Sequence, residues 1–160
     1  MTEIPQKNGN GRRRAVVGMV ITVLGFIIFV MGTSPELFNL DRSPVIGFVQ
    51  ISVFLFGLAL ICIGGYISLV SMWNGQPRTI GADIGIRLIA TGYVIAVASG
   101  LADVFGIGSQ PWPNIPSFGR WQSRGVLIGE AIIALGFFLL LPPRSPHEKD
   151  LDSPVSSEDS

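Results

Sequence analysis

The sequence is poor in the side chains on which most catalytic and metal sites depend. Its 160 residues include one cysteine and one histidine. Cys62 lies in an apolar run without a CxxC partner or a neighbouring histidine, so it predicts no internal disulfide, metal site or redox motif. His147 lies in a polar segment near the C-terminus. We therefore expect a protein that is not an enzyme and that carries no cofactor or metal.

Charged residues are also scarce, and neither sign is in excess. Asp, Glu, Lys and Arg make up 14% of the chain, against about 25% in soluble domains. The formal net charge is zero, so the chain lacks the basic field that attracts nucleic acid. Apolar residues take their place, and the mean hydropathy is +0.53. This composition predicts an integral membrane protein whose first partner is the lipid bilayer.

Four long apolar runs predict an all-α protein, a four-helix transmembrane bundle. A membrane crossing needs about 20 residues as a helix, whereas a membrane strand needs about 10 and alternates in polarity. Only helices satisfy their own backbone hydrogen bonds one segment at a time in lipid. We expect a transmembrane domain over residues 15–143, with helices at about 15–33, 45–73, 82–104 and 123–141.

The first run follows Arg12, Arg13 and Arg14 and has a signal sequence as its alternative interpretation. Its apolar core of roughly 17 residues is longer than the usual 7–15 of a signal peptide. We expect an uncleaved membrane anchor, since cleavage would leave three helices. Residues 1–14 are expected to form a polar, basic tail, and residues 144–160 a disordered acidic tail, because such segments have too little apolar surface to fold.

The distribution of Lys and Arg predicts that both termini are cytoplasmic, an N-in/C-in protein of the plasma (inner) membrane. Cytoplasmic loops carry the excess of Lys and Arg. With the N-terminus inside, seven of these residues fall on the inner side: Lys7, Arg12, Arg13, Arg14, Arg78, Arg144 and Lys149. Three fall on the outer side: Arg42, Arg120 and Arg124. Trp73 and Trp121 are then expected at the inner and outer interfaces.

Each predicted helix carries two glycines seven positions apart, and so on one helix face. The pairs are Gly18 and Gly25, Gly57 and Gly64, Gly85 and Gly92, and Gly129 and Gly136. Small residues let helix backbones approach closely, and close packing is a main source of attraction between helices in lipid. These eight glycines are our candidate helix-packing residues.

The glycine pairs also suggest two tandem helical hairpins in the same orientation. One shift along the chain, which we call the first repeat offset, carries Gly18 onto Gly85 and so the first pair onto the third. A slightly longer shift, the second repeat offset, carries Gly57 onto Gly129 and so the second pair onto the fourth. Other apolar residues also coincide under these shifts.

The departures from this repeat lie in the second hairpin. Under the second repeat offset Leu58 corresponds to Glu130, and under the first Val16 and Val20 correspond to Asp83 and Arg87. The second hairpin therefore holds the ionisable residues of the apolar runs.

Glu130 is the main candidate for an intramembrane polar site. It lies about seven residues, or roughly 10 Å, inside the predicted outer end of its helix, too deep for its side chain to reach water. Tyr93 is expected at a similar depth and is the first choice of partner, with Gln50 as a further neighbour. Without a nearby cation the protonated carboxyl is favoured at this depth. It could titrate during function or stay neutral as a bridge between helices.

Asp83 and Arg87 are the other ionisable candidates. They are four positions apart and can pair along one helix face. They fall near the inner end of the third run, where a long arginine side chain can reach the interface. The alternative is that Arg87 points into the bundle and holds an anionic group.

The combination of four helices and one membrane glutamate resembles the small multidrug transporters, in which the glutamate is on the first helix rather than the last. The segment from Ile84 to Leu141 is similar to DoxX-type membrane proteins in its loosely placed Arg, Gly and Glu residues. No residue role is carried over from either resemblance.

Two functions remain in view. The first is a non-enzymatic structural or accessory subunit, which packs with itself as a homo-oligomer or with a larger membrane complex. The alternative is a small proton-linked carrier or permease built around Glu130. Glycine-mediated packing and the lack of catalytic groups favour the first function.

Overall fold

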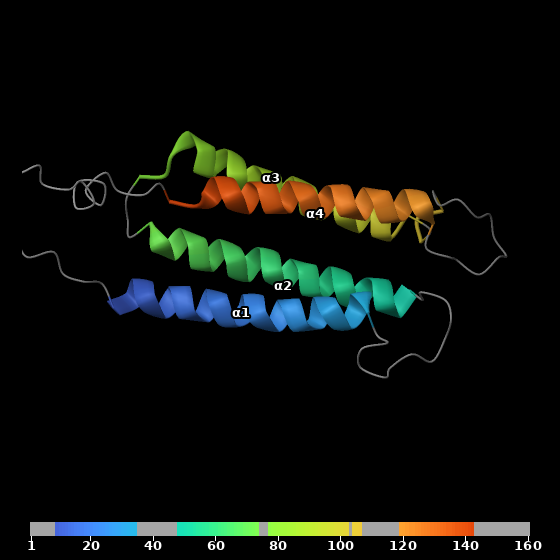
Figure 1. Ribbon diagram of the computed structural model, residues 1–160, viewed down its shortest axis with the longest axis horizontal. Helices are drawn as coiled ribbons and strands as arrows, with labels where there is room; N and C mark the ends of the chain where they lie inside the picture. Colours follow the sequence, from blue (N-terminus) through green and yellow to red (C-terminus); the bar gives the residue numbers. More distant parts are fainter. Residues whose placement is uncertain (1–8, 35–47, 74–76, 103, 107–118, 143–160) are drawn as a thin grey trace, which may run out of the picture.

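The computed structural model describes residues 9–34, 48–73, 77–102, 104–106 and 119–142, and within these residues all regular structure is helical. The helices are α1 (Gly9–Thr33), α2 (Phe48–Met72), α3 (Ile80–Gly100) and α4 (Arg120–Leu140). They run alternately in opposite directions, so α1 begins and α4 ends on the same side of the molecule (Figure 1). We call this side the proximal end and the opposite side the distal end.

All four helices are candidate membrane spans by length and composition. At about 1.5 Å per residue, the 25 residues of α1 and α2 and the 21 residues of α3 and α4 exceed the roughly 30 Å of a bilayer core. The expected all-α class and the four apolar helices are therefore confirmed. They indicate an integral membrane protein.

Helices α1, α3 and α4 begin earlier than the apolar runs predict. Residues 1–14 are expected as a tail, but α1 begins at Gly9 and includes Arg12, Arg13 and Arg14. Likewise α4 begins at Arg120, three positions before the predicted start. Arginine has a high helix propensity, so a charged residue ends the apolar run without ending the helix.

Local capping sets the two ends of α3. The hydroxyl of Thr79 accepts a hydrogen bond from the Ala82 N–H at 3.3 Å and fixes the start. The helix ends at Gly100 rather than 104, where the Ala102 N–H donates to the Ser99 carbonyl, three positions back instead of four. Gly106 follows with φ +72°, a conformation that favours glycine.

Some predictions fall outside the described residues. They concern the tails over 1–8 and 144–160, the start of the second run at 45–47, and the loop residue Arg42.

Helices α1 and α2 form hairpin 1, with glycines of the two helices facing each other. A Cβ atom placed on Gly18 would lie 2.7 Å from the Gly64 carbonyl oxygen, and one on Gly64 would lie 2.7 Å from that of Gly18. The corresponding distances for Gly25 and Gly57 are 2.9 and 2.8 Å. No side chain fits at these distances, so the close approach of the two backbones depends on glycine.

Helices α3 and α4 form hairpin 2 in the same way. A Cβ atom on Gly85 would lie 2.6 Å from the Gly136 oxygen, and one on Gly136 would lie 2.7 Å from the Gly85 oxygen. A Cβ atom on Gly92 would lie 2.6 Å from the Gly129 oxygen, and one on Gly129 would lie 2.6 Å from the Gly92 oxygen. The chain thus consists of two tightly packed hairpins.

The two hairpins share one helix register. The Phe29 backbone leaves no room for a side chain at Gly57, and the Ala96 backbone leaves none at Gly129. Ala96 is the equivalent of Phe29 under the first repeat offset. In the same way Thr22 blocks Gly64 in hairpin 1, and its equivalent Ile89 blocks Gly136 in hairpin 2. The two repeat offsets therefore carry the contacts of hairpin 1 onto those of hairpin 2.

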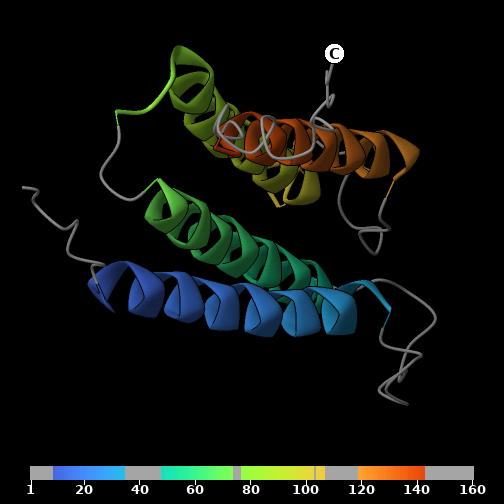
Figure 2. The same cartoon turned by 60° about the vertical axis from the view of Figure 1, so that its left-hand side comes forward.

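Hairpin 2 rests on α2. At the distal end a Cβ atom placed on Gly100 would lie 3.3 Å from the Leu55 side chain. Nearer the proximal end a Cβ atom placed on Gly65 would lie 2.7 Å from the Phe137 ring. At the proximal end the Trp73 Nε1–H donates to the Leu140 carbonyl at 3.1 Å. Among the described helices α1 contacts α2 alone, and it lies on the outer side of α2 in Figure 2.

Candidate polar site within the membrane spans

Glu130 lies at the midpoint of α4, ten positions from both Arg120 and Leu140. The sequence places it seven positions from the distal end, but α4 begins three positions earlier, so Glu130 is roughly 15 Å from either helix end. Its side chain is half-buried. Phe137 is seven positions, or two turns, further on and contacts Gly65 of α2. Glu130 therefore lies on the side of α4 that faces hairpin 1.

Tyr93 lies at nearly the same depth as Glu130. Gly92 and Gly129 are in mutual contact, and the two candidates are the next residues along their antiparallel helices. The side-chain hydrogen bonds found among the described residues nevertheless include neither Glu130 nor Tyr93. The structure thus brings the pair to one depth without joining the carboxyl to the phenol.

The Tyr93 ring lines a groove between α2 and α3 with a volume of about 320 Å³. The α2 wall consists of Ala59, Cys62, Ile63 and Tyr66, and the α3 wall of Ile86, Ile89, Ala90 and Tyr93. Both sets follow the spacing i, i+3, i+4, i+7 of one helix face. Because the helices are antiparallel, the two tyrosines lie at opposite ends of the groove, with aliphatic side chains and the Cys62 thiol between them.

The groove has an apolar surface with few groups that could react. The Cys62 thiol is free and buried, and the described hydrogen bonds do not involve Tyr66. Apolar grooves of roughly 300–1,000 Å³ are typical of sites for small apolar molecules. The lining suits contact with hydrocarbon better than binding of a polar or charged substrate.

Gln50 lies at another depth. It is the third residue of α2 and half-buried. Under the second repeat offset Glu130 corresponds to Leu58 of α2, and the shared register puts these two residues at the same depth. Leu58 is eight positions after Gln50, so Gln50 and Glu130 differ in depth by roughly 12 Å. The neighbouring Ser52 hydroxyl donates to the Phe48 carbonyl of its own helix at 2.9 Å.

Asp83 and Arg87 lie in the first two turns of α3, and both side chains are exposed. Gly85, between them, faces α4, so these side chains point away from the seam of hairpin 2. Arg87 is five positions from Gly92, the residue level with Gly129. The structure therefore brings neither residue to Glu130.

Two polar side chains that sequence reasoning missed are buried at helix ends. The Gln122 Oε1 accepts a hydrogen bond from the Gly119 N–H at 2.7 Å and caps α4, while its Nε2 has no partner in the described part of the chain. The spacing of three between a cap position and a glutamine is a recognisable capping signal. The second side chain is Trp73, whose bond to Leu140 has no local signal in the sequence.

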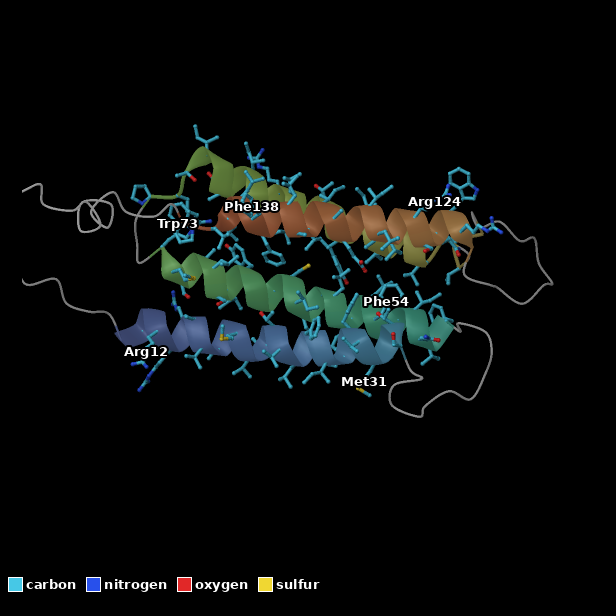
Figure 3. All side chains as sticks on the ribbon, viewed as in Figure 1. Arg12, Met31, Phe54, Trp73, Arg124 and Phe138 are labelled. Atoms are coloured by element: carbon cyan, nitrogen blue, oxygen red, sulfur yellow. The ribbon has the colours of Figure 1, made fainter. Side chains whose placement is uncertain are left out.

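The described polar groups do not converge on one point. Among residues 9–34, 48–73, 77–102, 104–106 and 119–142 no group of three His, Cys, Asp or Glu side chains could hold a metal ion. The charged residues at the distal end include Arg124, whose guanidinium lies 5.5 Å from the centre of the exposed Trp121 ring. Arg124 and Arg12 mark opposite ends of the molecule in Figure 3.

Comparison with known proteins assigns no relative. No protein-family model matches the chain, and no curated protein or solved structure is significantly similar to it. The fold and the residues described above are therefore the basis for any functional proposal.

Proposed function

We propose that the chain is a small non-enzymatic integral membrane protein that acts as an assembly subunit. It would be N-in/C-in in the plasma membrane. The observation that carries the proposal is that α1 contacts α2 alone among the described helices. A helix with one neighbour has most of its circumference free for another protein.

The glycine seams support the proposal from another side. They hold each hairpin together by backbone contact, so a hairpin can present a fixed outer surface to a partner. Association in lipid relies on such preformed, close-fitting surfaces, because burial of apolar area gives little driving force there.

The test is the mass of the protein–detergent complex at native expression level. The tagged chain is extracted in mild detergent, and its protein mass is measured by light scattering, with co-purifying proteins identified by mass spectrometry. We expect several copies, or this chain with a defined second protein. A lone monomer with no partner in the extract would contradict the proposal.

The second candidate is a small proton-linked carrier. It is favoured by the half-buried carboxyl at the midpoint of α4 that lacks a hydrogen bond among the described residues. Ionisable groups at such depth are usually functional. The exposed positions of Asp83 and Arg87, and the depth of Gln50, weigh against a convergent substrate site.

Glu130→Gln distinguishes this candidate, because the amide keeps the shape and a hydrogen-bonding group but cannot titrate. A carrier requires that pH-dependent flux into liposomes is lost in the variant. Asp83→Asn, which removes an exposed carboxyl, is the matched control and should leave flux unchanged. Equal flux in wild type and Glu130→Gln would rule the carrier out.

A further inference from the structure

The two walls of the groove between α2 and α3 have equivalents that are mostly exposed; Thr22, which contacts Gly64 of α2, lies at the edge of one of them. The second repeat offset carries the α2 wall onto a strip of α4, which we call the α4 strip: Ala131, Ala134, Leu135 and Phe138. The first repeat offset, applied in reverse, carries the α3 wall onto the α1 strip: Met19, Thr22, Val23 and Phe26.

The equivalent strips keep the pattern of side-chain size. From the α2 wall to the α4 strip an alanine is retained, a thiol becomes a methyl group, an aliphatic side chain stays aliphatic, and the aromatic ring of Tyr66 becomes that of Phe138. From the α3 wall to the α1 strip the ring of Tyr93 becomes that of Phe26. In each case three non-aromatic side chains are followed by one ring, which is also the arrangement on the two walls of the groove.

These strips are open while the groove walls are partly covered. Phe138 is 73% exposed, Phe26 58% and Met19 63%, whereas Tyr66 and Tyr93 are half-buried between α2 and α3. The α4 strip lies toward the proximal end of α4, where Figure 3 labels Phe138. The contact that the repeat predicts between α4 and α1 is therefore unmade within the described part of the chain.

The contacts of hairpin 2 keep the α4 strip away from α1 of the same chain. Phe137 against Gly65 and the bond from Trp73 to Leu140 hold α4 on α2. While these contacts persist, only another chain can supply an α1 strip.

We infer that the α4 strip of one copy packs antiparallel on the α1 strip of a second copy, as the α2 wall meets the α3 wall within one chain. The inference rests on the proposed assembly function and names its partner as this same chain. Ala59 and Tyr93 are at the first and last positions of their walls, so Ala131 lies opposite Phe26 of the second copy. In a dimer with a two-fold axis this contact forms twice, so both strips of both copies are covered. Two-fold symmetry is the commonest closed symmetry of protein oligomers.

Disulfide trapping in native membranes tests this contact. In a Cys62→Ala background, one tagged chain carries Ala131→Cys and a second, differently tagged chain carries Phe26→Cys, and the co-expressed pair is oxidised with copper phenanthroline. We expect a covalent dimer that carries both tags. Ala131 and Phe26 are both exposed, so these two substitutions leave the packing within each chain intact.

Two controls calibrate the trapping. Ala59→Cys with Tyr93→Cys in one chain tests the template contact and should close within the monomer. Leu24→Cys replaces Phe26→Cys in the negative control. Leu24 is 53% exposed, but its helical position is about 160° from that of Phe26. It should therefore give no crosslink to position 131.

The alternative outcomes separate this inference from the proposed function. Absence of the dimer that carries both tags would overturn the inference, as would a dimer trapped only between two copies of position 131. Co-purification of a different protein without self-contact would overturn it while the assembly function stands. A lone monomer in detergent and in membranes would defeat both.

Discussion

At the scale of single residues, Trp73 shows how a membrane tryptophan can serve the fold. Hydropathy predicts an interfacial position, because it follows an apolar run and precedes polar residues. In the structure Trp73 lies at the proximal end, its ring is only 5% exposed, and its Nε1–H donates to the Leu140 carbonyl. That carbonyl is among the last four of α4, which have no partner within the helix. Trp73 thus caps α4 and ties hairpin 2 to α2.

Trp73→Phe should weaken the contact between the hairpins while each hairpin stays folded. The variant leaves the Leu140 carbonyl without this donor, and interhelical hydrogen bonds in membranes contribute roughly 0.6–1.7 kcal/mol. We expect a loss of about 1 kcal/mol in unfolding free energy, measured by steric trapping in bicelles. Trp121→Phe, at a ring that is 75% exposed, should change it by less than about 0.5 kcal/mol. Equal effects at the two positions would contradict the capping role.

Glu130 shows what single-residue reasoning misses. A lone carboxyl in an apolar run is visible in the sequence, and Tyr93 is correctly expected near its depth. The actual depth depends on where α4 begins, and the hydropathy pattern gives this three positions too late. Whether a carboxyl meets a phenol depends on the rotation of both helices and on α2, whose contacts are distant in sequence. Local sequence patterns therefore do not predict whether Glu130 and Tyr93 are in contact.

At the scale of helices, the spacing of glycines carries most of the predictable structure. Pairs seven positions apart define one face of each helix, and those faces meet in the structure as mutual contacts between Gly18 and Gly64 and between Gly92 and Gly129. The pairing follows from local information, since consecutive helices joined by a loop are antiparallel neighbours. Helix ends are less predictable, because arginines continue a helix beyond the apolar run.

Gly129→Ala should destabilise hairpin 2, whereas Gly81→Ala should not. The new methyl group at position 129 would lie 2.6 Å from the Gly92 oxygen, but at position 81 the nearest atoms are 3.8 Å away. Forcing the backbones apart costs roughly 1–3 kcal/mol, while an alanine in an open helical position is neutral or stabilising by up to about 1 kcal/mol. Unfolding in mixed micelles would measure both. Similar stability of the two variants would show that the seam tolerates a methyl group.

At the scale of the whole molecule, the described cations favour one orientation. The proximal end carries Arg12, Arg13, Arg14 and Arg78, and the distal end carries Arg120 and Arg124. An excess of Lys and Arg marks the cytoplasmic side of membrane proteins. The start of α1 and the end of α4 lie on the same side in Figure 1, and in the proposed orientation this side is cytoplasmic.

Epitope tags at both termini should therefore be inaccessible to antibody in intact cells and become accessible once the membrane is permeabilised. A tag inserted between α3 and α4 is the control and should be accessible from outside without permeabilisation. An externally accessible tag at either terminus would refute the N-in/C-in orientation.

The arrangement of the hairpins is the least predictable level of the fold. Composition and run length predict a four-helix bundle, but they do not determine how the helices neighbour one another. The position of hairpin 2 depends on a few contacts of α2, such as Phe137 on Gly65 and Leu55 on Gly100. No periodicity in the sequence marks these residues, because each contact joins residues more than forty positions apart.

The solitary position of α1 against α2 has a consequence for biosynthesis. Almost all contacts of the first two helices are with each other, so hairpin 1 can complete its packing before α3 has left the ribosome. Domains generally fold in the order of their synthesis, and local contacts form fastest. Each hairpin can thus be inserted into the bilayer as a unit, one after the other. Hairpin 2 then packs on an α2 surface that has already folded.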